Sequence, residues 1–205
     1  YVGRGALPLE LLGYVQAREY HATFARTEAD RSAEQPALDQ YNTPALGAGG
    51  KIEMRPVIGP ASLSLGADLR YREGSTNERY DFDGDTLVSL RRAGGESLVA
   101  GAFAGGAFAA GEGLTLTAEG RVDRWSLSNG SRTEIDRLPG PEARSDSLFP
   151  DRHGWEPSGR VGLAYQPAGA VTLRASAYSS WRLPTLNELY RPYRVGPDAT
   201  AANEA

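Results

Sequence analysis

Hydrophobic and polar side chains alternate along several stretches of the chain with a period of two residues. The clearest stretch is 62–72, where leucines, an alanine and a tyrosine share one parity while serines, an aspartate and arginines share the other. The same alternation recurs at 114–123 and at 171–182. Successive side chains of a β-strand point to opposite faces of the sheet. Each stretch therefore predicts a strand with one apolar and one polar face.

Weaker versions of the pattern bring the number of predicted strands to seven. Strands near 46–55 and 160–165 are shorter but keep the alternation. The stretch 97–110 is apolar on both parities, and 11–26 mixes charged and apolar residues on one parity. The orientation of these last two strands stays open, and either could contain a β-bulge.

The connections between the predicted strands alternate in length. Short turns marked by Pro or Gly are expected at 56–60, 111–113 and 166–169. Long polar loops are expected at about 27–44, 74–95 and 128–153. Outer-membrane β-barrels have this asymmetry, with short periplasmic turns and long extracellular loops. A soluble β-sandwich has no reason to alternate its turns in this way and is the less favoured alternative.

The composition suits a barrel and excludes a helical membrane protein. Of the 205 residues, 40% are hydrophobic and 23% are charged, and the mean hydropathy is -0.44. The longest uncharged run, 97–111, has 15 residues, fewer than the roughly 18 to 20 that a membrane-spanning helix needs. Seven strands are too few to close an outer-membrane barrel, whose strand number is even and at least about 8. We therefore expect an all-β, antiparallel, up-and-down transmembrane segment of about seven long strands, part of a larger barrel.

The two parities predict the two faces of this sheet. The apolar parity is expected on the convex, lipid-facing side, and it includes Leu63, Leu65, Leu69, Leu114, Leu116, Val122, Val171, Leu173 and Trp181. The other parity is expected to line a wet interior with both signs of charge, through Lys51, Glu53, Arg55, Asp68, Arg70, Arg72, Glu119, Arg121, Asp123, Arg174 and Arg182. Aromatic residues near the loop ends predict an interfacial girdle, with inward-facing rings as the alternative, at Tyr71, Tyr80, Trp125, Trp155, Trp181 and Tyr190.

Residues 180–192 form a motif of mixed chemistry that reads Ser-Trp-Arg-Leu-Pro-Thr-Leu-Asn-Glu-Leu-Tyr-Arg-Pro. This motif resembles the aromatic-Arg-x-Pro-Thr-x-x-Glu-Leu-Tyr box of TonB-dependent outer-membrane receptors, which closes one barrel strand and opens an extracellular loop. It departs from the family pattern at Leu183, where Ala is usual, and at Asn203-Glu204, where the family has Asn-Pro. Alternatively, the two prolines of the motif only end a strand and punctuate a surface loop.

The resemblance implies a localisation, a function and a set of partners. It implies that residues 1–205 are part of a receptor barrel of 22 strands, whose other strands and N-terminal plug domain lie outside this chain. Such a receptor lies in the outer membrane of a Gram-negative cell, in contact with its lipid. It takes up a large scarce nutrient, such as a ferric siderophore or cobalamin, with energy from the TonB complex. Heme fits less well, because heme receptors place a His inside a related box and none lies between Pro184 and Asn203.

The segment 184–205 is predicted to be an extracellular loop that begins the ligand-capture surface. The short 166–169 turn places the start of the last strand at the periplasmic end, so the other end emerges outside. The candidate ligand-binding residues are Arg182, Asn187, Glu188, Tyr190, Arg191 and Tyr193. A box that only terminates the strand is the alternative.

Other kinds of chemistry find little support in the sequence. His21 and His153 stand apart from any second metal ligand, so we expect no metal site, no cofactor and no enzyme. Asp81, Asp83 and Asp85 fit the first positions of an EF-hand, but the Gly and Glu that complete such a loop are missing, which favours a solvated acidic loop. The formal net charge of -4 argues against a nucleic-acid partner. A passive porin-like or structural outer-membrane barrel is the main alternative function.

Overall fold

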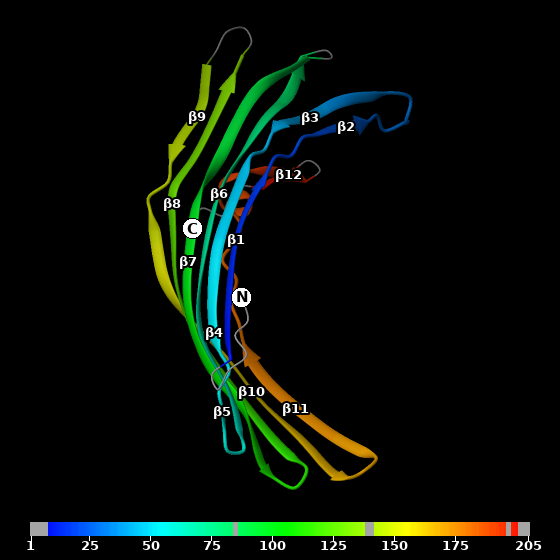
Figure 1. Ribbon diagram of the computed structural model, residues 1–205. Coiled ribbons are helices and arrows are strands. Elements are labelled where there is room, and N and C mark those ends of the chain that lie inside the picture. The colour runs from blue at the N-terminus through cyan, green and yellow to red at the C-terminus, as the bar shows by residue number, and fades with distance from the viewer. Residues whose placement is uncertain (1–7, 84–85, 138–141, 196–197, 201–205) are drawn as a thin grey trace.

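The computed structural model describes residues 8–83, 86–137, 142–195 and 198–200, and for 142–145, 193–195 and 198–200 it describes the backbone. These residues form one long, curved antiparallel sheet with one short helix and a small separate hairpin (Figure 1). The elements are β1 Leu9–Arg18, β2 Ala22–Thr27, β3 Glu34–Asn42, β4 Ala45–Met54, β5 Val57–Ile58, β6 Ala61–Asp83, β7 Thr86–Gly111, β8 Leu114–Asp136, β9 Glu142–Leu148, β10 Arg152–Ala168, β11 Val171–Ser179, α1 Leu186–Tyr190, β12 Tyr193–Val195 and β13 Asp198–Thr200.

Seven strands of the sheet form a continuous path of hydrogen-bonded neighbours in the order β1-β4-β6-β7-β8-β10-β11. Each strand is antiparallel to the next, and the path follows the order of the chain. The predicted antiparallel up-and-down order is therefore confirmed along this seven-strand path. Four further strands, β2, β3, β5 and β9, bring the sheet to 11 strands. Within the described residues, β1 and β11 are the two edges of the path.

Tight turns join the strands at one end of the sheet. Gly59 and Gly113 have φ angles of 57° and 71°, in the left-handed region that glycine adopts without steric cost. The turn predicted at 166–169 lies slightly later, because β10 continues to Ala168 and β11 begins at Val171. The other two short turns fall within their predicted ranges, at 59–60 and 112–113, but the short strand β5 Val57–Ile58 occupies part of the first range.

The prediction of three long polar loops is wrong, because most of their residues continue as paired strand. β6 and β7 have 23 and 26 residues, and their ladder extends from Ala61 opposite Phe108 to Asp83 opposite Thr86. In the other two regions, β3 pairs with β2 and β6, and β9 pairs with β8. Polar side chains occur on both parities of these outer extensions, so the apolar alternation disappears while the backbone ladder persists.

The first predicted strand, 11–26, is also wrong, because it is two strands. β1 ends at Arg18 and pairs with β4, whereas β2 begins at Ala22 and pairs with β3. Between them, the Thr43 amide donates a hydrogen bond to the Tyr20 carbonyl, which closes the junction. The break interrupts the parity, and this explains why no single orientation could be assigned from the sequence.

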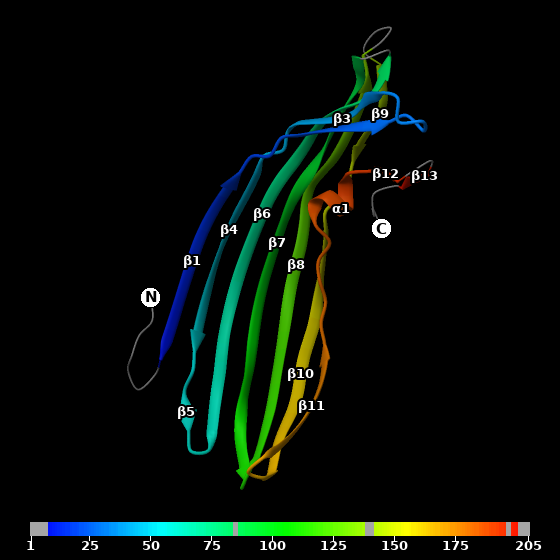
Figure 2. The ribbon, with the colours of Figure 1, turned by 90° about the vertical axis from the view of Figure 1, so that its right-hand side faces the viewer.

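Large apolar side chains cover the convex face of the sheet. The ladder places Leu163 of β10 opposite both Leu116 of β8 and Ala175 of β11, and thus builds an apolar row across strands. Leu116 and Leu173 are 42% and 56% exposed. The six leucines and two valines predicted for this face lie on it. The helix α1 covers the opposite face (Figure 2). Among the described residues no helix is long and apolar enough to span a membrane.

Candidate functional site on the concave face

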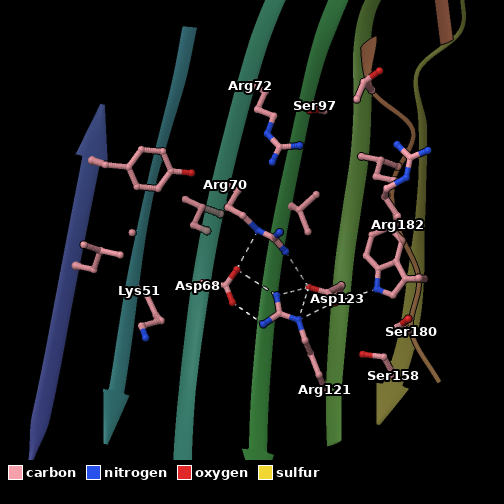
Figure 3. A pocket seen from close by; sticks show the side chains of 18 residues that line it. Lys51, Asp68, Arg70, Arg72, Ser97, Arg121, Asp123, Ser158, Ser180 and Arg182 are labelled. Carbon is pink, nitrogen blue, oxygen red and sulfur yellow. Dashed lines mark hydrogen bonds and ion pairs between the residues drawn. The ribbon is translucent and has the colours of Figure 1, made fainter. Parts of the chain in front are cut away.

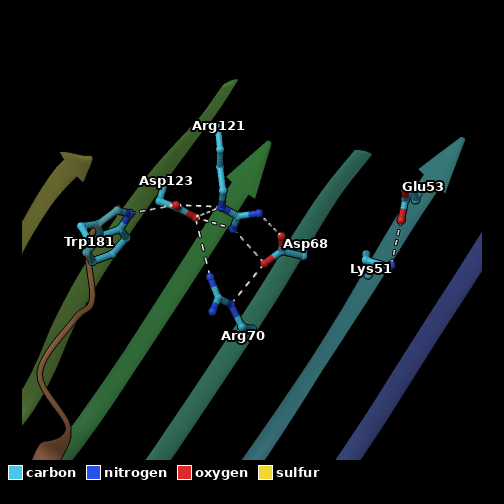
Figure 4. Close-up of polar contacts among 7 residues, drawn as sticks. All are labelled: Lys51, Glu53, Asp68, Arg70, Arg121, Asp123 and Trp181. Atoms are coloured by element: carbon cyan, nitrogen blue, oxygen red, sulfur yellow. Dashed lines mark hydrogen bonds and ion pairs between the residues drawn. The ribbon is translucent and has the colours of Figure 1, made fainter. Parts of the chain in front are cut away.

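The charged parity of the strands lies on the concave face, as predicted. The guanidinium of Arg121, from β8, donates to Asp123 of the same strand at 2.8 Å and to Asp68 of β6 (Figure 4). Gly101 of β7 lies in the same row between the two aspartates. A Cβ at this position would collide with Arg121 and Asp123. Glycine therefore lets the guanidinium cross over β7 and link β8 to β6.

Asp123 is almost completely buried, with 1% exposure. Its Oδ2 also accepts a hydrogen bond of 3.0 Å from the indole Nε1 of Trp181. The guanidinium of Arg70 lies 3.8 Å away. Buried carboxylates are stable only with such partners. The indole contact also ties the residues that follow β11 to the wall formed by β6, β7 and β8.

A second ion-pair network lies nearer the short turns. Glu53 of β4, 6% exposed, accepts hydrogen bonds from Lys51 Nζ at 2.8 Å and Arg55 Nε at 2.7 Å. Ser64 Oγ donates to the same carboxylate, and Lys51 also pairs with Glu10 of β1. These contacts join β1, β4 and β6 and balance their charges locally.

Residues 180–192, here called the strap, leave the sheet edge after β11 and return across the concave face (Figure 2). Thr185 is the N-cap of α1: its Oγ1 accepts from the Glu188 amide, and the Glu188 carboxylate accepts from the Thr185 amide at 2.7 Å. Arg182 donates two hydrogen bonds to the same carboxylate, at 2.7 and 2.9 Å. The Arg182 guanidinium, followed by the Thr185 donors, lowers the pKa of Glu188 to about 2. This reciprocal capping explains why so short a helix forms.

Tyr190 anchors the helix to the wall. The side chain is 1% exposed, and its ring lies against the backbone at Gly95 and Gly130. Cβ atoms at these two positions would lie 2.8 and 2.6 Å from ring carbons. The ring centroid of Phe149 is 5.1 Å from that of Tyr190. Leu189 completes a small apolar cluster with Ala93 and Leu127. The strap thus fits onto glycines that leave room for the ring.

The end of the strap is fixed by a buried ion pair. The Glu78 side chain on β6 is 0% exposed and accepts from Arg191 Nε at 2.6 Å. The same carboxylate accepts from Arg91 Nη1 at 3.1 Å and from Gln40 Nε2 at 2.8 Å. Arg91 also donates to the carbonyl of Pro192. Two guanidiniums and an amide therefore converge on one carboxylate.

A cavity of about 610 Å³ opens between the strap and the wall (Figure 3). Its lining includes two tyrosine or tryptophan rings, several hydroxyls and both signs of charge. The charged residues that line it are Lys51, Asp68, Arg70, Arg72, Arg121, Asp123 and Arg182. Cationic side chains outnumber the carboxylates in this lining. Such a cavity has the size and polarity to hold part of a small polar molecule.

Almost the whole chain matches a known family: the family model described as "TonB dependent receptor-like, beta-barrel" covers residues 9–204. The chain belongs to the TonB-dependent receptor family. No curated protein matches this chain. TonB-dependent receptors are outer-membrane transport proteins rather than enzymes. In a barrel built from this wall, the concave face lines the lumen and the convex face is the outer surface. The predicted resemblance of residues 180–192 to this family is thereby confirmed.

Five of the six residues predicted to bind ligand hold the receptor's strap in place in this structure: Arg182, Asn187, Glu188, Tyr190 and Arg191. Asn187 does so through Oδ1, which accepts a hydrogen bond from Thr76 Oγ1 at 3.2 Å. Tyr193 begins β12, and its side chain lies outside the described residues. A ligand-capture role for these residues stays a prediction.

The path of the strap corrects two expectations. The strand ladder ends at Ser179, before Pro184, and the predicted loop begins as a luminal segment that includes α1. Trp181, predicted on the lipid-facing parity, turns to the lumen, where Asp123 accepts its indole hydrogen. The chain has left the sheet at this point, so the alternation no longer applies, and a lipid-facing N–H would lack a partner. Asn203-Glu204 lies outside the described residues.

The predicted aromatic girdle is wrong for four residues, which face the lumen: Tyr80, Trp125, Trp181 and Tyr190. Tyr80 donates to Glu134 at 2.9 Å, and Trp125 packs against the apolar cluster under the strap. Tyr71 and Trp155 lie on the convex side, where the Arg124 guanidinium is 5.5 Å from the Trp155 ring. Closeness to a strand end therefore does not decide which face an aromatic residue takes.

Three residues of the strap site went unrecognised in the sequence: Glu78, Gly95 and Gly130 fell inside or beside stretches that resemble polar loops. Extending the polar parity of 62–72 outward would have placed Glu78 on the luminal face. No comparable signal marks the two glycines. Within the described ranges, no group of three or more His, Cys, Asp or Glu residues could hold a metal ion. Asp85 of the predicted acidic loop lies outside those ranges.

Proposed function

We propose that this chain forms part of the barrel of an energised receptor in the Gram-negative outer membrane. The receptor takes up a large scarce nutrient, such as a ferric siderophore or cobalamin. Outer-membrane lipid contacts the convex face, a plug domain of the same receptor occupies the lumen, and the TonB complex supplies the energy. The remaining strands and the plug domain lie outside residues 1–205 in this proposal.

The docked strap is the observation that carries the proposal. A passive pore needs an open, water-filled lumen. Here, residues 180–192 lie across the luminal face of the wall. Trp181 is hydrogen-bonded to Asp123, and Arg191 is paired with Glu78. The Tyr190 ring packs against the backbone at Gly95 and Gly130. A fixed luminal element narrows the passage and bounds a cavity, which suits the capture of a particular solute.

The luminal charges support contact with a plug domain. Arg121 is shared between Asp68 and Asp123, and Lys51 is shared between Glu10 and Glu53. The wall therefore offers many hydrogen-bonding groups of both signs. A globular domain can rest against such a surface through polar and water-mediated contacts, which resist its displacement less than a dry apolar interface does.

Uptake by cells that express the intact receptor tests this function. Labelled ferric siderophores and cobalamin are offered to cells with and without TonB, and cells without the receptor give the baseline. We expect saturable uptake of at least one compound that disappears without TonB. Uptake that rises linearly with concentration and ignores TonB would instead establish the passive porin.

A liposome-swelling measurement provides the second arm. The purified intact receptor is inserted into liposomes and small sugars are added outside. A plugged receptor should leave the swelling rate close to that of empty liposomes, whereas an open porin-like barrel should raise it strongly. Rapid sugar entry through the unmodified receptor would contradict the proposal.

A further inference from the structure

We propose that the luminal cavity binds the anionic part of the ligand, a carboxylate or similar oxyanion, through Arg70, Arg72 and Arg182. The inference rests on the proposed uptake function and names the chemistry that the receptor recognises. Figure 3 shows Arg70 and Arg72 one above the other on β6, and Arg182 on the strap at the other side of the cavity.

Arg72 has no ion-pair partner among the described residues, so its charge is available to an anion that enters the cavity. Its exposed guanidinium projects into the cavity, and the ladder places it opposite Ser97 of β7. Within the described part of the chain, no carboxylate pairs with it. The two aspartates of the cavity are already engaged, because Arg121 donates to both Asp68 and Asp123. A free cation beside committed carboxylates favours an external anion.

Arg70 offers further donors to the same space. Its Nε lies 3.2 Å from Asp68 Oδ1, but the angle is unsuitable and this buried nitrogen makes no hydrogen bond in the described structure. Its Nη2 is 3.8 Å from Asp123, beyond hydrogen-bonding distance. The side chain is 41% exposed. Arg70 is therefore held beside two carboxylates without having its donors used, and its exposed edge faces the cavity.

Arg182 closes the cavity from the strap. It gives two of its five N–H donors to Glu188 and is 67% exposed, so donors remain for a ligand. Guanidinium groups bind carboxylates through paired hydrogen bonds, which makes a set of arginines selective for planar oxyanions. The hydroxyls that line the same cavity could complete the shell of such an anion, and they belong to Ser97, Ser158, Ser180 and Thr185.

Equilibrium binding of tricarballylate, a free tricarboxylate, to the purified intact receptor tests this inference. Calorimetry at low salt should show saturable binding that weakens as salt is added. Arg72→Gln should weaken it by about tenfold or more, the loss expected for one charge-assisted pair. Arg174→Gln is the matched control, because Arg174 lies on the luminal face of β11, outside the cavity lining and without an ion-pair partner in the described residues. The corresponding neutral triamide should not bind.

Two results would overturn the inference. One is that tricarballylate does not bind to the unmodified receptor, as when a carboxylate of the plug already fills the cavity. The other is that the Arg72 and Arg174 variants lose affinity equally. Neither result touches the proposed function, since TonB-dependent uptake is measured separately. A receptor that transports its nutrient but ignores tricarballylate refutes the anion site alone.

Discussion

Replacing Glu78 by Gln should release the strap from the barrel wall. The Glu78 side chain is 0% exposed and accepts hydrogen bonds from Arg191 at 2.6 Å and from Arg91 at 3.1 Å. Glutamine keeps the shape of the side chain but removes the negative charge. It also turns an N–H donor toward two guanidiniums that need acceptors. Arg191 is then left at the wall with weaker compensation for its charge.

The free-energy cost of this change depends on how well Arg91 and Arg191 can replace the lost carboxylate with other partners. Removing one partner of a fully buried ion pair costs about 3–5 kcal/mol. Arg91 keeps its pair with Glu134 at 2.9 Å, and the Arg191 side chain is 16% exposed, so water and a neighbour restore part of the loss. We expect the docking of the strap to weaken by about 2–4 kcal/mol, which corresponds to a roughly 30- to 700-fold change in its equilibrium.

Hydrogen exchange of the strap amides measures this equilibrium. The amides of Leu189 and Arg191 donate to the carbonyls of Thr185 and Asn187, so they exchange only when α1 opens. In the Glu78→Gln receptor they should exchange faster by that factor, while the strand amides keep their rates. Glu119→Gln is the control. Glu119 pairs with Arg160 at 3.1 Å but its side chain is 47% exposed.

Unchanged exchange at Leu189 and Arg191 in the Glu78→Gln receptor would refute the reasoning. So would an equal acceleration by Glu119→Gln, because the effect would then come from any lost luminal charge. A change limited to the strap supports the view that the buried ion pair, rather than the apolar cluster alone, holds it.

Three further predictions concern the lipid face, the strap and the ligand. Leu116→Arg should lower the free energy of unfolding in lipid vesicles by about 2–4 kcal/mol if position 116 lies near the bilayer midplane. Thr117→Arg, on the luminal face of the same strand, should cost much less, and equal costs would mean that the faces are reversed. The stabilisation from Glu188, whose pKa is lowered to about 2, should be complete above its ordinary pKa near 4.3 and be lost as the pH falls through about 2. Strap amide exchange against pH measures this, and Glu188→Gln should abolish the dependence; a persisting dependence would assign it to another group. Replacing Arg182 and Tyr190 together by Ala should weaken binding of the transported nutrient while the barrel still assembles. Unchanged uptake would leave the strap a structural role alone.

The membrane-spanning part of the fold could be predicted because the two faces of each strand there lie in environments of different polarity. Leu116 and Arg121 lie on opposite parities of one strand, and the structure places them on opposite faces. Where the two faces no longer differ in polarity, the alternation of apolar and polar residues disappears. Glu78 continues the luminal parity of Asp68, yet its neighbours are polar on both sides and the stretch resembles a loop.

The candidate site could be located by its motif, but the roles of its residues could not be read from it. The box at 180–192 has donors, acceptors and rings that would suit a ligand equally well. The partners that use them lie far away in the sequence, as with Arg191 and Glu78 or Tyr190 and Gly130. No local pattern encodes such a meeting, because it depends on the register of the strands that lie between the two residues.

The long sequence separation of the strap contacts has a consequence for how the barrel wall assembles. Thr76 and Asn187 are 111 residues apart, and Glu78 and Arg191 are 113 apart, whereas β6, β7 and β8 pair through successive hairpins. Closing a longer chain loop costs more entropy, and non-local contacts form later in folding. Tyr190 packs against Gly95 of β7 and Gly130 of β8, so its site forms only once these two strands have paired. We therefore expect the strap to dock only after β6, β7 and β8 have paired in register.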